Sequence, residues 1–104
     1  MKIHLIKEQT IRNYVLGNAR SKVSFEDWIS KIKLADWGIP KDIKKTFNSA
    51  DLLGKSSNRV VFDIVGGNYR LIIKVEYTFG VVYVSFFGTH QEYDKINANT
   101  INLY

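Results

Sequence analysis

The chain has no cysteine and a single proline among its 104 residues. Without cysteine there is no disulfide, no thiolate nucleophile and no cysteine-ligated metal site, and this is compatible with the cytoplasm, where we expect the protein. No stretch approaches the roughly 18 apolar residues that a membrane-spanning helix needs. Because 45% of the residues are hydrophobic, the chain can bury one core, and its length predicts one domain over residues 1–104.

Sequence motifs for several common chemistries are also absent. There is no Gly-x-x-x-x-Gly-Lys phosphate loop, no His-Glu-x-x-His, no Gly-x-Ser-x-Gly and no Asp-rich calcium loop. ATP binding, zinc hydrolysis, acyl transfer and calcium binding therefore have no motif support. We expect neither a cofactor nor a metal site.

Charge is present, but it is unevenly distributed. The formal net charge is +5, and residues 1–57 hold 11 Lys/Arg against 6 Asp/Glu, whereas residues 58–104 hold 4 against 4. A basic surface attracts polyanions in general, so charge alone leaves nucleic acid, an acidic protein and an anionic membrane open. The cluster of Lys41, Lys44 and Lys45 is either a solvated helix face or a phosphate contact.

The strongest pattern lies in residues 58–94, which predict three successive strands followed by a polar cap. Gly66 and Gly67 separate the first two strands with a dipeptide that suits a type I′ hairpin turn. A two-residue loop there pairs Asp63 with Arg70. One face of the hairpin is then charged, bearing Arg59, Asp63, Arg70 and Lys74. The other face is apolar and should face the core, with Val60, Phe62, Ile64, Tyr69, Leu71, Ile73, Val75 and Tyr77.

A three-residue second turn would pair Tyr77 with Val81 and so place Arg70 opposite Gly88. His90 would then be a diagonal neighbour of Arg70, at roughly 7–8 Å on the same face. A two-residue turn would reverse this parity.

The first half of the chain predicts a short strand at residues 1–6 and a helical pattern from Lys7. A second helix should begin at Ser24, a good N-cap, and a short helix should restart at Pro40. Residues 51–57 are expected to form a loop. The apolar stripe of the second helix, spaced i, i+3, i+4 and i+7, consists of Phe25, Trp28, Ile29 and Ile32, and we expect it to pack on the apolar sheet face.

Arginine, histidine and tyrosine around the polar cap suit the cleavage of RNA without a metal. That reaction needs a base for the ribose 2′-hydroxyl, a cation for the phosphate and an acid for the departing 5′-oxygen. Histidine exchanges protons near neutrality, and arginine matches phosphate oxygens. Taken alone, Arg70 with Asp63 is equally an ordinary ion pair, and His90 is equally a structural residue.

The sequence resembles the HigB-type toxins of bacterial toxin-antitoxin pairs, a branch of the RelE/ParE-like superfamily. The resemblance rests on residues 61–64, on 66–72 with Val75, and above all on the ending Thr-His-x-Glu-Tyr-Asp at residues 89–94, about twenty residues after Asn-x-Arg-Leu. It implies a small α+β domain in which two N-terminal helices pack on an antiparallel sheet. It also implies an endoribonuclease that cleaves messenger RNA, often on the ribosome, without a metal or a membrane, and that is silenced by a HigA-like helix-turn-helix antitoxin.

Carried over residue by residue, the resemblance implies the catalytic residues Arg70, His90 and Tyr93. Upstream lysines used by some relatives have no clear match, so RNA binding would fall to Arg59, Asn68 and Lys74. Two other functions stay open: a ParE-like inhibitor of a protein target such as DNA gyrase, and a noncatalytic RNA-binding domain.

Overall fold

The computed structural model describes residues 4–6, 9, 12–13, 19–53, 58–64, 68–77, 80–98 and 100–101. The predicted Gly66–Gly67 turn and most of the helical pattern after Lys7 lie outside these residues. Along the chain the elements are β1 (His4–Ile6), α2 (Ala19–Lys33), α3 (Pro40–Thr46), β2 (Asp51–Leu52), β3 (Arg59–Ile64), β4 (Tyr69–Glu76), β5 (Val81–Thr89) and α4 (His90–Tyr93). The strands form one sheet in the order β1-β5-β4-β3-β2. Neighbours are antiparallel except β1, which runs parallel to β5.

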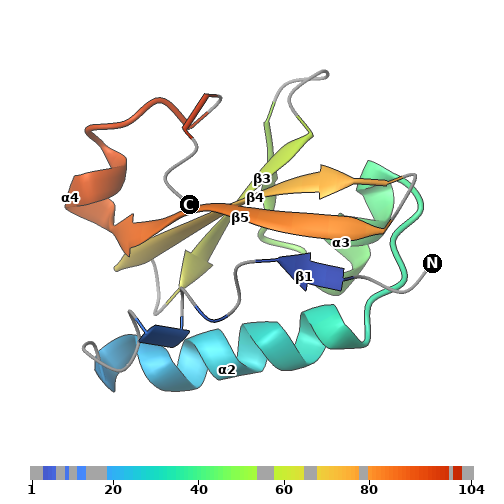
Figure 1. Cartoon of the computed structure of the whole chain (residues 1–104), viewed down its shortest axis with the longest axis horizontal. Helices are drawn as coiled ribbons and strands as arrows, with labels where there is room; N and C mark the ends of the chain where they lie inside the picture. The colour runs from blue at the N-terminus through green and yellow to red at the C-terminus, as the bar shows by residue number, and fades with distance from the viewer. Residues whose placement is uncertain are drawn as a thin grey trace.

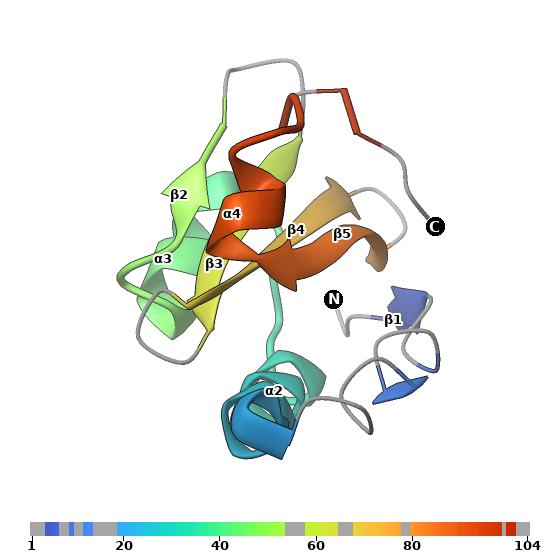
Figure 2. The same cartoon turned by 90° about the vertical axis from the view of Figure 1, so that its left-hand side faces the viewer.

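The α+β architecture is as predicted, with α2 and α4 on opposite sides of the sheet (Figures 1 and 2). On the α2 side, the helix stripe and the apolar strand face form one buried cluster, which confirms that packing. Trp28 is 3% exposed, and its ring meets that of Phe62 edge to face at a centroid distance of 5.4 Å. In the described part of the chain, no helix is long and apolar enough to cross a membrane.

Two predicted boundaries were wrong. The helix α2 begins at Ala19, so Ser24 lies inside it and is not its N-cap. The five residues before Ser24 include no glycine or proline that would stop the helix from extending backward. Asp51 and Leu52, expected in a loop, form the short strand β2 and pair with Val61 and Val60.

The helix α3 begins at Pro40 as predicted. The Oδ2 atom of Asp42 accepts hydrogen bonds from the backbone N–H groups of Gly38 at 2.8 Å and Ile39 at 3.2 Å. These bonds satisfy donors at the start of the helix, and they hold the pKa of Asp42 below its ordinary value.

The lysine cluster on α3 is committed to local contacts. Lys44 Nζ donates to the backbone oxygens of Asn48 at 3.1 Å and Ala50 at 2.7 Å. Lys45 Nζ lies 3.8 Å from a carboxylate oxygen of Asp42. Lys44 therefore holds the chain that leads into β2, which favours the structural interpretation of the cluster over a phosphate contact.

The pairing of β3 with β4 confirms the predicted register. Asp63 lies opposite Arg70, and Arg59 lies opposite Lys74. The alternation of apolar and polar side chains was enough to fix this register, because a slip by one residue would turn every core side chain toward solvent.

The pairing of β4 with β5 differs from the prediction at one end and agrees at the other. Val81 pairs with Glu76 and not with Tyr77, so the second turn is wrong by one residue. The register then shifts between Ile72 and Ile73, where Ser85 is an extra residue on β5 without a partner on β4. This β-bulge restores the predicted pairing of Arg70 with Gly88.

The sheet face expected to be charged is apolar in its middle. Val61, Ile72 and Phe86 lie side by side on β3, β4 and β5 and are buried. The residues that pack against them are Leu53, Tyr93, Ile96, Ala98 and Ile101. The chain after β5 therefore covers this face and leaves polar groups only at its two ends.

Candidate active site

Residues 89–94 form a single capped turn at the end of β5. Thr89 N–H donates to Glu92 Oε1 at 2.8 Å, and Glu92 N–H donates to Thr89 Oγ1 at 3.1 Å. This reciprocal pair is a capping box, which satisfies two backbone donors that a helix start leaves unpaired. The Thr-x-x-Glu part of the sequence pattern thus fixes where α4 starts and how its side chains are directed.

His90 is the first residue of this turn, and its side chain is 54% exposed. Its backbone N–H donates to the backbone oxygen of Asn68 at 3.0 Å, which ties the start of α4 to the start of β4. Its Nδ1 lies 3.4 Å from Asp94 Oδ1. A carboxylate beside one ring nitrogen orients the imidazole and leaves Nε2 for proton exchange with a bound group.

Arg70 is held from two sides. Its Nε lies 3.1 Å from Asp63 Oδ1 on the neighbouring strand, and its guanidinium carbon lies 5.6 Å from the centre of the Tyr93 ring. Both contacts favour the cation, through charge and through the electron-rich ring face. The arginine side chain is 17% exposed, so its position is largely determined before any ligand arrives.

Tyr93 connects the two candidate groups. It follows His90 by three residues in α4, a spacing that places side chains on the same side of a helical turn. Its ring supports Arg70 on one side and packs near Phe86 at a centroid distance of 6.5 Å on another. Arg70, His90 and Tyr93 therefore border one surface patch, as the strand pairing of Arg70 with Gly88 predicted.

Arg59, predicted to bind RNA, is instead a buried structural residue. It is 6% exposed, and its guanidinium donates to the backbone oxygens of Ala98 and Ile101. Burial lowers its pKa from the ordinary value, yet a guanidinium stays charged at neutral pH. Its charge holds the C-terminal segment on the sheet, so we leave Arg59 out of the RNA contacts proposed below.

The other two predicted RNA contacts differ in position. Asn68 is exposed beside His90, where its backbone oxygen is already used. Lys74 is half-buried between Arg59 on β3 and Tyr83 on β5. It lies four residues from Arg70 on β4, or about 13 Å along a strand, so it borders the far end of the same face.

Sequence reasoning missed the supporting residues of the patch. Asp94 beside His90, and the capping pair of Thr89 with Glu92, were part of the quoted pattern without a physical role. Two signals were present: an i, i+4 spacing between histidine and aspartate, and Thr-x-x-Glu directly after a strand. Among the described residues, no three His, Asp or Glu side chains come together as a candidate metal site.

A comparison with known families decides the relationship. The family model for HigB_toxin, described as the RelE-like toxic component of a toxin-antitoxin system, matches residues 21–96, which is well over half of the chain. The protein belongs to this family. The matched region includes the whole of the Arg70, His90 and Tyr93 patch. A search of curated proteins found no match. As a RelE-like toxin, the chain has an antitoxin as its natural partner.

Gly88 is the residue on which the packing of this toxin's capped turn depends most directly. A Cβ atom there would lie 2.8 Å from an atom of the Phe86 ring and 3.0 Å from Glu92 Oε1. Gly88→Ala is therefore expected to lower the free energy of unfolding by about 1–3 kcal/mol, the usual cost of overpacking.

Urea denaturation measures this change, and Gly38→Ala is the matched control. At Gly38 the nearest group to a new Cβ is Asp42 Oδ2 at 3.7 Å, an ordinary contact, so that variant should stay within about 0.5 kcal/mol of the wild type. Equal stability of the two variants would refute the packing at Gly88.

Proposed function

We propose that this toxin is a metal-independent endoribonuclease that cleaves messenger RNA in the cytoplasm, on the ribosome, and that a HigA-like helix-turn-helix antitoxin silences it. The observation that supports this proposal is the patch at the end of β5, where an oriented arginine and an exposed histidine share one tyrosine. These are a phosphate-binding cation and a proton-transfer group placed side by side.

In the proposed reaction the ribose 2′-oxygen attacks the neighbouring phosphorus atom. A bond forms between the 2′-oxygen and phosphorus, the bond from phosphorus to the 5′-oxygen breaks, and the products are a cyclic phosphate and a 5′-hydroxyl. Arg70 binds the phosphate and stabilises the charge that develops on its oxygens. His90 transfers a proton to or from the reacting oxygens, and Asp94 keeps its ring in position.

Asp63 and Tyr93 position Arg70 in this mechanism. A phosphate would compete with the Asp63 carboxylate for the planar guanidinium, and two parallel hydrogen bonds to phosphate favour the exchange. The half-buried Tyr93 carries the arginine on its ring and is proposed to contact the ribose. Asn68 and Lys74 extend the RNA contacts on either side of Arg70.

The test is a translating extract that contains EDTA, to which purified toxin is added, with the 5′ ends of the messenger mapped afterwards. New 5′ ends inside coding sequences are expected. Intact messenger together with arrested translation would contradict the proposal and favour a ParE-like protein target. Intact messenger that co-purifies with the toxin would favour a noncatalytic RNA-binding domain.

A further inference from the structure

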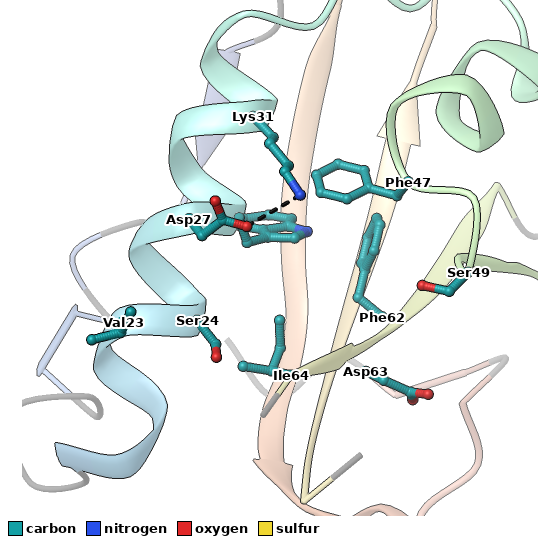
Figure 3. Close-up of a pocket in the computed structure, with 10 residues that line it drawn as sticks. Val23, Ser24, Asp27, Lys31, Phe47, Ser49, Phe62, Asp63 and Ile64 are labelled. Atoms are coloured by element: carbon teal, nitrogen blue, oxygen red, sulfur yellow. Dashed lines mark ion pairs between the residues drawn. The ribbon is translucent and has the colours of Figure 1, made fainter. Parts of the chain in front are cut away.

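A second concave feature lies away from the proposed active site, on the α2 side of the sheet. It is a groove of about 480 Å³ between α2 and the edge of β3. Figure 3 shows Ser24, Asp27 and Lys31 of α2 on one side, and Phe62 of β3 with Ser49 on the other. The mechanism proposed above uses no residue of the groove apart from Asp63.

The groove exists because β2 is short. Asp51 pairs with Val61, so two further residues of β2 would have brought Ser49 opposite Asp63. A turn closed by the hydrogen bond from Ala50 N–H to the backbone oxygen of Phe47, at 3.0 Å, takes the chain away from the sheet instead. In the part of the chain that the structure describes, no strand pairs with β3 beyond Val61 on this side.

The backbone of Asp63 faces this vacant edge. Asn58 accepts from Val75 of β4, whereas Arg59 accepts from Leu53 on the β2 side. Because successive residues of a strand direct their backbone groups to opposite edges, Asp63 directs its N–H and C=O to the same edge as Arg59. An unpaired strand edge inside a groove is a template for an extended peptide.

The walls of the groove are apolar. Trp28 and Phe62 line it, and Val23 at its mouth is 78% exposed. The indole N–H of Trp28 is a buried side-chain donor without a hydrogen-bond partner among the described residues. A peptide carbonyl that reaches this wall would supply the missing acceptor.

The charges of the groove disfavour RNA as the occupant. Asp27 and Asp63 line it together with a single cation, Lys31, on a chain whose net charge is +5. Asp27 and Lys31 form an ion pair at 3.2 Å, and Asp63 pairs with Arg70. The lining is locally acidic, so it repels a polyanion and suits a neutral or basic peptide.

We propose that this groove is the docking site for an extended segment of the antitoxin. The segment adds as a strand to the edge of β3 at Asp63 and places an apolar side chain between Trp28 and Phe62. The proposal rests on membership of the toxin family and not on the ribonuclease activity proposed above, so either can fail without the other.

Hydrogen exchange at the amide of Asp63 tests the strand pairing directly. The ¹⁵N-labelled toxin is saturated with the purified product of the antitoxin gene adjacent to its own. Exchange at Asp63 should slow by at least about tenfold, because a paired strand amide exchanges only when the pair opens. An unchanged exchange rate in the saturated complex would overturn the proposal. So would equal protection by a second copy of the toxin or by an RNA oligonucleotide.

A pair of tryptophan substitutions on α2 tests the groove itself. Ser24→Trp fills the groove from the helix side and should weaken antitoxin binding by more than about tenfold, the loss of one well-buried contact. Ser30→Trp puts the same side chain at an exposed position of the same helix and should stay within about twofold. Wild-type affinity of a folded Ser24→Trp protein would refute the site. If that variant is unfolded by thermal melting, the exchange at Asp63 in the wild-type toxin decides alone.

Discussion

Replacing Arg70 with alanine or His90 with glutamine is expected to lower the rate of messenger cleavage about a hundredfold to a thousandfold each, while the protein stays folded. The first change removes the cation that meets the phosphate, and the second removes the proton-transfer group; losses of this size are typical for either. Growth arrest on expression should disappear with both variants. The measurement is the rate of cleavage in the EDTA-containing extract, with the fold checked by thermal melting.

The charge-matched control for Arg70→Ala is Lys41→Ala, which removes one positive charge from an exposed position on α3. It should leave the cleavage rate within about twofold of the wild type, since a single distant surface charge has little effect. Cleavage at the wild-type rate by both folded active-site variants would remove Arg70 and His90 from the mechanism.

Trp28→Ala is expected to have the largest effect on stability, lowering the free energy of unfolding by about 3–5 kcal/mol. Its ring is buried between α2 and the sheet, near Phe62 at 5.4 Å and near Phe25 and Phe47 at centroid distances of 6.0 and 6.2 Å. Truncation would leave a cavity that the three surrounding rings cannot fill without leaving their own contacts.

Urea denaturation measures this loss, and Leu34→Ala is its control. Leu34 follows the last turn of α2 and is 88% exposed, so its truncation should change stability by no more than about 0.5 kcal/mol. An unchanged melting temperature for Trp28→Ala would disprove the packing of α2 on the sheet.

The sequence was sufficient wherever the information was local and periodic. The alternation in β3 and β4 determines which side chains face α2, and the helical stripe with Trp28 identifies the surface that covers them. Both follow from burial, since neither surface can leave water without the other. The grouping of Arg70 with His90 was also predicted, but by a turn of the wrong length.

What could not be predicted depends on contacts between distant segments. The burial of Arg59 requires knowing that residues 98–101 fold back over the sheet, and no spacing around Arg59 indicates this. The apolar middle of the same face has the same cause, because Ile96 and Ile101 cover Ile72 only after the chain has turned at α4. The groove beside Asp63 arises from the early end of β2, which two residues of strand are too short to signal.

The extra residue at Ser85 has a consequence for how variants of this chain can arise. Deleting one residue between Gly80 and Phe86 would turn the end of β5 over, so that the side chain at position 90 would start from the opposite face of the sheet. Adding or removing two residues would preserve the facing and only lengthen or shorten the strand. Spacing along β5 is therefore constrained as odd or even and not as a fixed length, and an alignment that admits a single gap there pairs histidines that do not share a surface.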